Sequence, residues 1–133
     1  MSQIIATIKN IRNVDSLNIV EFGFYNHTLK MVSLNLSKQI SINKKVQLSI
    51  KPTNILIAKK FEGEISISNQ LKAKIVKVEN GELLSSILLK VEDTILESII
   101  TVDSSKNMNL VEDEEVLILI KASDLFIQEV IDE

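Results

Sequence analysis

The sequence predicts an all-β protein made of two tandem five-stranded barrels. Hydrophobic residues make up 45% of the 133 residues but aromatic residues only 4%, so Ile, Leu and Val carry the apolar content. Branched side chains such as Ile and Val favour strands because they pack well on a pleated surface. Short apolar stretches are separated by polar turns, and this pattern occurs twice along the chain.

An internal repeat divides the chain into two halves. Residues 50–57, Ile-Lys-Pro-Thr-Asn-Ile-Leu-Ile, return about 70 positions later as residues 120–127, Ile-Lys-Ala-Ser-Asp-Leu-Phe-Ile. Earlier in each half the spacing is about 67, as Ile8 and Ile75 show. The spacing changes just before Ile40, in the lead-in to a turn, where deletions are tolerated. The predicted domains are residues 1–60 and 65–133, joined by a linker over 61–64.

Each half is expected to form five strands and one irregular crossover. Asn80-Gly81 is the strongest hairpin signal, because both residues accept the positive φ of a two-residue turn. Residues 103–110 are expected to form a short helical or irregular link. This pattern is typical of a small OB-like barrel, whose closure would leave no exposed sheet edge. The predicted strands are 4–12, 17–24, 28–36, 46–51, 55–58, 71–79, 83–91, 94–102, 115–121 and 126–131.

Barrels of this size bury too little surface to be stable alone. We therefore expect the two halves to pack together and the chain to form a homo-oligomer, either a dimer or a trimer. The β-rich termini favour exchange of strands between subunits.

Composition argues against several classes of partner. The chain has no Cys and one His, His27, so no zinc site is expected. The net charge is −3, and the acidic run 112–115 is not balanced by a basic stripe, so no nucleic-acid partner is expected. No apolar run approaches the roughly 18 residues of a membrane span, and no secretion signal is present. We expect a cytoplasmic protein without a membrane partner.

Catalytic motifs are absent from the sequence. It contains no Gly-rich phosphate loop, no nucleophile elbow and no paired acid and base, and the pattern of a calcium loop is missing. The sequence therefore predicts a binding protein that is not an enzyme and has no metal-ion site of its own.

Four elements of the second half occur in an order that points to a known family. They are residues 66–71 (Ser-Ile-Ser-Asn-Gln-Leu), 72–75 (Lys-Ala-Lys-Ile), 100–104 (Ile-Thr-Val-Asp-Ser) and 120–125 (Ile-Lys-Ala-Ser-Asp-Leu). Together they resemble the Mop (TOBE) family of molybdate-binding domains. The first half is a weaker copy, in which Ser33 or Ser37 stands for the second Ser of the third element. The family's Arg in the opening motif is Ser68 here.

The resemblance implies molybdate or tungstate as the ligand, no organic cofactor, and sites at subunit interfaces. Tandem copies without a DNA-binding region resemble stand-alone proteins that store or buffer molybdate. The alternatives are a ligand-sensing regulatory module without its DNA-binding domain, and an interaction domain that has lost its ligand. Sulfate stays open as the anion, because cavity size cannot be inferred from the sequence.

Candidate ligands follow from the chemistry of a tetrahedral oxyanion, which offers only acceptor oxygens. Its site needs hydroxyl, backbone N–H and Lys donors, with no ionised carboxylate nearby. Ala122 and Ser123 are expected to open a helical turn with free N–H groups, whereas Pro52 removes one such group from the first copy. Hydroxyls at strand ends also commonly cap turns, which is the structural alternative. The predicted oxyanion-binding residues are Thr101, Ser104, Lys121, Ala122, Ser123, Lys51, Thr53, Ser66 and Ser68.

Overall fold

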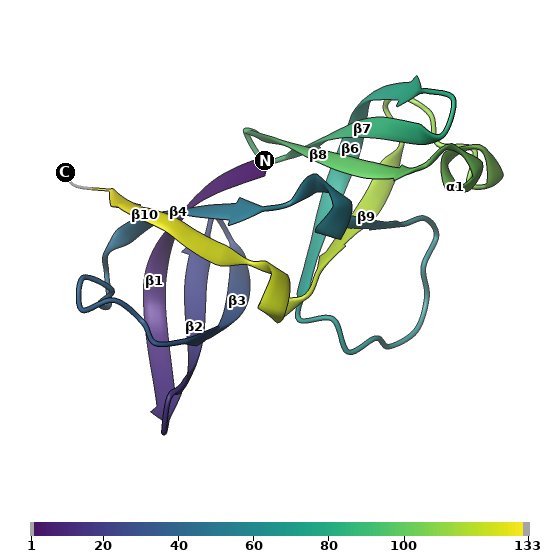
Figure 1. Ribbon diagram of the computed structural model, residues 1–133. Coiled ribbons are helices and arrows are strands. Elements are labelled where there is room, and N and C mark those ends of the chain that lie inside the picture. Colours follow the sequence, from purple (N-terminus) through teal and green to yellow (C-terminus); the bar gives the residue numbers. More distant parts are fainter. Residues whose placement is uncertain (1, 132–133) are drawn as a thin grey trace.

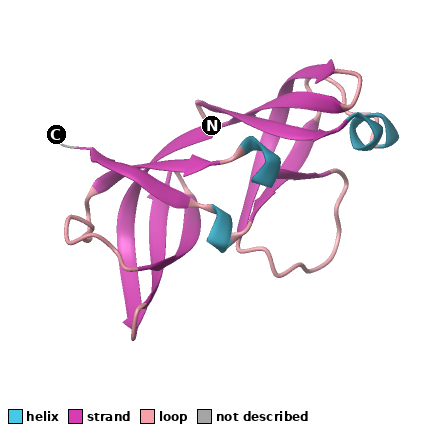
Figure 2. Ribbon diagram, in the orientation of Figure 1, coloured by secondary structure: helices cyan, strands magenta, loops and turns pink. Residues whose placement is uncertain are grey.

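The computed structural model describes residues 2–131, so residue 1 and residues 132–133 of the two predicted repeats lie outside the described part. The chain forms two curved, five-stranded antiparallel sheets that lie side by side (Figures 1 and 2). The first half contributes β1 (Ser2–Val14), β2 (Leu17–Phe24), β3 (His27–Leu34), β4 (Lys45–Ile50), the 3-10 turn η1 (Pro52–Asn54) and β5 (Leu56–Ala58). The second contributes β6 (Asn69–Asn80), β7 (Leu84–Val91), β8 (Thr94–Thr101), α1 (Val102–Asn107), β9 (Glu115–Ile120), η2 (Ala122–Asp124) and β10 (Phe126–Ile131).

The predicted all-β class is confirmed. Strands β2 and β10 have the predicted bounds. The helix α1 begins at Val102, one residue before the link that was expected to be helical or irregular, and ends within it. Alternation of buried and exposed residues along β1 and β6 explains why these segments form strands, because successive side chains point to opposite faces. The buried faces of both sheets form one continuous apolar cluster that includes Ile8, Phe22 and Leu89.

The Asn80-Gly81 hairpin differs from the prediction. Asn80 still belongs to β6, and Gly81 does not take a positive φ. The Asn80 side chain instead accepts hydrogen bonds from the hydroxyls of Ser85 (2.7 Å) and Ser105 (2.8 Å). Gly81 is needed for close approach, because an added Cβ would lie 2.8 Å from the backbone oxygen of Leu84.

Each sheet takes its outer strand from the other half of the chain. The strand orders are β10-β4-β1-β2-β3 and β5-β9-β6-β7-β8. Strands are therefore exchanged between the two halves of one chain. Exchange between subunits stays a prediction. The exchange within the chain also carries η1 onto β8 of the second sheet and η2 onto β3 of the first, as Figure 1 shows.

Neither sheet is closed by hydrogen bonds between its edge strands. In the described residues β3 does not pair with β10, and β8 does not pair with β5. The expectation that closure removes the edges is therefore wrong. The turns η1 and η2, packed against β8 and β3, occupy the place where a closing strand pair would lie.

Two reciprocal contacts join the barrels. The buried side chain of Asn69 accepts the Lys30 N–H (2.7 Å) and donates to the Lys30 carbonyl oxygen (2.9 Å). Ser2 contacts Glu97 in the same way, since its hydroxyl accepts the Glu97 N–H (2.8 Å) and donates to the carbonyl oxygen (3.3 Å). The first residue of β6 is thus fixed to β3, and the first residue of β1 to β8.

A half-buried ion pair should make the stability of the second barrel sensitive to acid. Lys59 Nζ lies 2.8 Å from Glu114 Oε2 and also donates to the Met108 carbonyl oxygen (2.7 Å) at the end of α1. The hydrogen bond from Lys59, assisted by the Val111 N–H, lowers the pKa of Glu114 below its ordinary value. A lowered folded-state pKa stabilises the fold above the unfolded-state pKa, and this contribution is lost as the pH falls through the folded-state pKa.

We therefore expect acidification from pH 6 to pH 3 to lower the melting temperature of the wild type more than that of Glu114→Gln. Calorimetric melting across this range measures the difference. Glu115→Gln, a change at an exposed neighbour, is the control and should behave like the wild type. Equal acid sensitivity in Glu114→Gln and wild type would contradict a stabilising role for the pair.

Candidate functional site

The turn η2 presents the first group of predicted ligands. Lys121 is its N-cap, and the Asp124 N–H donates to the Lys121 carbonyl oxygen at 2.9 Å, so the expected helical turn is present. The side chains of Lys121 and Ser123 are exposed. Asn69 pairs with Ile120 across β6 and β9, so Ser68 and Lys121 emerge at the same end of the second sheet.

The turn η1 presents the second group. Lys51 is its N-cap, the Asn54 N–H donates to the Lys51 carbonyl oxygen at 2.9 Å, and Thr53 is exposed. The turn is fixed to the second barrel, because the hydroxyl of Ser98 in β8 donates to the Ile55 carbonyl oxygen at 2.6 Å. Its sequence departs from η2 at Pro52, which removes one N–H donor.

The hydroxyls of Thr101 and Ser104 take part in a helix cap. Thr101 Oγ1 accepts the Ser104 N–H at 3.1 Å and donates to Ser104 Oγ at 2.9 Å. This is the usual arrangement of an N-cap residue, which satisfies a backbone donor at the start of a helix. Both residues are exposed, and each keeps acceptor or donor capacity toward the surface.

The structure sorts the nine predicted residues into two groups that cross the halves. Residues 68 and 121–123 of the second half lie at the end of the second sheet that packs against β3 of the first half, and residue 66 is in the loop that leads into β6. Residues 51 and 53 of the first half lie against β8, the strand that ends at Thr101. The strand that leads to Thr101 and Ser104 therefore contacts η1, the turn of the other repeat. Sequence reasoning missed this crossing, because it depends on the strand exchange.

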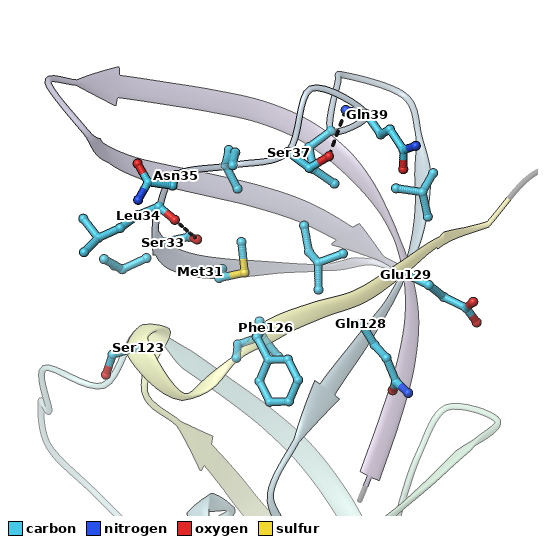
Figure 3. Close-up of a pocket in the computed structure, with 16 residues that line it drawn as sticks. Met31, Ser33, Leu34, Asn35, Ser37, Gln39, Ser123, Phe126, Gln128 and Glu129 are labelled. Atoms are coloured by element: carbon cyan, nitrogen blue, oxygen red, sulfur yellow. Dashed lines mark hydrogen bonds between the residues drawn. The ribbon is translucent and has the colours of Figure 1, made fainter.

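A pocket of about 500 Å³ lies between β3, β10 and η2 (Figure 3). Its walls include Ser123 and both serines that could stand for the missing element of the first half, Ser33 and Ser37. Most of the remaining wall is apolar, and the one charged residue in it is Glu129, whose side chain points away from Met31 in Figure 3. Without a cation this pocket alone is not a complete site for a dianion.

The two turns also differ in charge. Asp124, half-buried, follows Ser123 in η2, whereas the corresponding residue of η1 is Asn54. A carboxylate beside the hydroxyl opposes a bound anion, so η2 carries one favourable and one unfavourable charge.

Over residues 2–131 there is no cluster of three His, Cys, Asp or Glu side chains that could hold a metal ion. In the same part of the chain, no helix is long and apolar enough to cross a membrane.

The fold and the paired turns define a tandem OB-like β-barrel protein, and comparison with known proteins identifies the family. Residues 65–127 match the TOBE domain. A molybdate-binding protein from Sporomusa ovata is 32% identical over a match that covers 45% of this chain and 90% of that protein, with a TM-score of 0.44. Residues 65–127, the second half of the chain, are therefore assigned to the TOBE domain family.

The tandem architecture is shared with a solved structure. The cytoplasmic molybdate-binding protein ModG, crystallised with molybdate bound, is 18% identical, and the match covers 94% of this chain and 93% of that one with a TM-score of 0.87. This likeness shows that both chains have the same two-barrel fold. No curated protein matches the chain significantly in sequence.

Proposed function

We propose that the chain binds molybdate or tungstate as a tetrahedral dianion, through the turns η1 and η2. Both turns carry a Lys at the N-cap and a hydroxyl two positions later, and both side chains are exposed. This repeated arrangement is the observation that carries the proposal, and it is supported by the family and by the molybdate bound in ModG. No organic cofactor is required.

The proposed sites are completed by a second copy of the chain. Each group of donors lies on an exposed surface, and neither Lys51 nor Lys121 lines a described pocket. An anion bound there by one chain would stay in contact with water, which weakens its electrostatic binding. Packing a neighbouring chain over the turns would enclose it, so we propose a homo-oligomer, a dimer or trimer, with ligands between subunits. Such an oligomer would store or buffer the anion in the cytoplasm.

The second candidate function is an interaction domain that no longer binds an anion. Two observations favour it, namely Ser68 at the position of the family's Arg and Asp124 beside Ser123. Both lower the positive charge around η2. The two candidates differ in their response to molybdate.

Calorimetric titration of anion-free protein with molybdate, and with sulfate as the control, tests the proposal. We expect heat and saturation with molybdate and a much weaker response to sulfate. The stoichiometry would show whether the η1 group also binds. A folded protein that gives no heat with molybdate would contradict the proposal and favour the interaction domain.

Removing the opposing carboxylate should strengthen binding. Asp124→Asn gives η2 the amide found in η1 and is expected to lower the molybdate dissociation constant by about fivefold, because two unit charges at about 4 Å in water interact by about 1 kcal/mol. The control is Asp113→Asn, which lies before β9, at the end of the second sheet away from η2. An unchanged constant in Asp124→Asn would indicate that the anion does not bind beside Ser123.

A further inference from the structure

The turns that lead into β4 and β9 have closely similar backbones but opposite charges. The N–H of Asn43 in the first turn and that of Asp113 in the second donate to carbonyl oxygens of β1 and β6, both at 2.8 Å. Both residues are left-handed, with φ of 74° for Asn43 and 67° for Asp113. The next residue is Lys44 in the first turn and Glu114 in the second, so a cation and a carboxylate occupy equivalent places in the two barrels.

The outer strands place Lys59 and Val130 at equivalent positions as well. Residue 58 of β5 lies opposite residue 117 of β9, and residue 129 of β10 lies opposite the repeat-equivalent residue 47 of β4. The residue that follows is Lys59 in the second barrel and Val130 in the first. The two barrels therefore differ in charge at both members of this pair of positions.

In the second barrel these two positions neutralise each other. Lys59 Nζ lies 2.8 Å from Glu114 Oε2 and fills the space beside the turn. In the first barrel the side chain of Val130 is short and apolar, and Lys44 makes no ion pair within residues 2–131. The first barrel therefore has an unpaired cation at the place where the second barrel holds a neutral pair.

A pocket of about 370 Å³ opens at this place in the first barrel, and it is lined by Lys38, Gln39, Ser41, Lys44 and Val130. Lys38 supplies a second cation, and no carboxylate of the described residues lines the pocket. The side chains of Gln39 and Ser41 add neutral hydrogen-bond donors. The pocket thus combines two positive charges with neutral donors, which is the lining that an anion requires.

We propose that this pocket binds a phosphate group, either free or carried by a small organic molecule. Phosphate has several acceptor oxygens and a negative charge, which match the two ammonium groups and the two neutral donors. The volume lies in the range of about 300–1,000 Å³ that is usual for ligand pockets, and it leaves space beside the anion for an organic part next to Val130.

The pocket is separate from both turns that we propose for molybdate. Strand β4 begins beside the pocket and ends at η1, whereas β10 begins at η2 and ends beside the pocket. Each strand has six residues and is therefore about 20 Å long. The phosphate site goes beyond the proposed function and does not depend on it.

Titration of isotopically labelled full-length protein with inorganic phosphate, and separately with glycerol 3-phosphate, tests the proposal by NMR. We expect saturable shift changes at residues 38–44 and 130, and none with chloride at the same ionic strength. Tighter binding of glycerol 3-phosphate would assign the pocket to organic phosphates, and tighter binding of inorganic phosphate to the free anion. No saturable change at residues 38–44 with either compound, or changes centred on η1 and η2, would overturn the proposal.

Single substitutions show whether the two cations act specifically. Lys38→Ala and Lys44→Ala should each weaken phosphate binding by about tenfold, because each removes a charged hydrogen-bond donor. Lys106→Ala, which removes an exposed Lys from α1 of the second barrel, is the control and should leave the affinity unchanged. An equal loss in Lys106→Ala would show that only the overall charge of the protein matters and would contradict a site at this pocket.

A double variant transfers the neutral pair of the second barrel to the first. Lys44→Glu combined with Val130→Lys should abolish the shift changes caused by phosphate, because a carboxylate replaces one cation and the new Lys fills the pocket. The spectrum of residues outside the pocket should stay that of the wild type, which distinguishes loss of the site from unfolding. A folded double variant that binds phosphate at residues 38–44 with wild-type affinity would overturn the proposal.

Discussion

Replacing Lys121 with Ala is expected to weaken molybdate binding by about tenfold to a hundredfold. Hydrogen bonds to charged groups contribute about 1.5–3 kcal/mol, and the ammonium of Lys121 is the positive charge that η2 itself offers. The side chain is exposed and makes no ion pair in the described residues, so the free energy of unfolding should change little. Titration calorimetry measures the first quantity, and urea denaturation the second.

Two further variants make this result specific. Lys90 is exposed and lies at the end of the second sheet opposite to η2. Lys90→Ala should therefore leave the molybdate dissociation constant unchanged. Lys121→Arg keeps the charge and should retain most of the affinity. If Lys121→Ala binds molybdate like the wild type, η2 is not the binding turn. If Lys51→Ala alone causes the loss, the η1 group is the functional one.

Asn69→Ala is expected to lower the free energy of unfolding by about 1–3 kcal/mol, the cost of leaving a buried donor or acceptor without a partner. The side chain of Asn69 is 1% exposed and binds both backbone groups of Lys30, so its loss leaves the contact between β6 and β3 unsatisfied. Urea denaturation followed by circular dichroism measures the change.

The matched control is Gln70→Ala at the next position. Gln70 is exposed and its side chain donates only to the nearby Ile67 carbonyl oxygen, so its removal should change stability by less than about 0.5 kcal/mol. A change in Asn69→Ala as small as that in Gln70→Ala would show that the barrels are held together by the apolar core and not by this contact.

Local features of this fold could be predicted from the sequence. Alternation of apolar and polar residues identified the strands, and the Lys-small-hydroxyl pattern identified η2 as a helical turn. The sequence analysis named capping of a turn as the alternative to anion binding for hydroxyls at strand ends, and Thr101 is such a cap. These features depend on residues a few positions apart, so the information lies within each segment.

Long-range pairing could not be predicted in the same way. Residues 56–58 and 126–131 follow similar motifs, and β4 and β9 carry similar patterns, so either closing strand fits either sheet. The choice depends on contacts such as Asn69 with Lys30, which join different halves. The sequence placed Asn69 in a motif but did not indicate that Lys30 is its partner. For the same reason it could not show that each turn contacts the other half of the chain.

The most direct test of the account is a crystal structure of the protein grown with molybdate, with data collected at the molybdenum absorption edge. We expect anomalous peaks within hydrogen-bonding distance of Lys121 and Ser123, of Lys51 and Thr53, or of both groups, each covered by a neighbouring chain. Molybdenum peaks away from both turns, or none in crystals of the folded protein at saturating molybdate, would contradict the assignment of η1 and η2 as the oxyanion-binding turns.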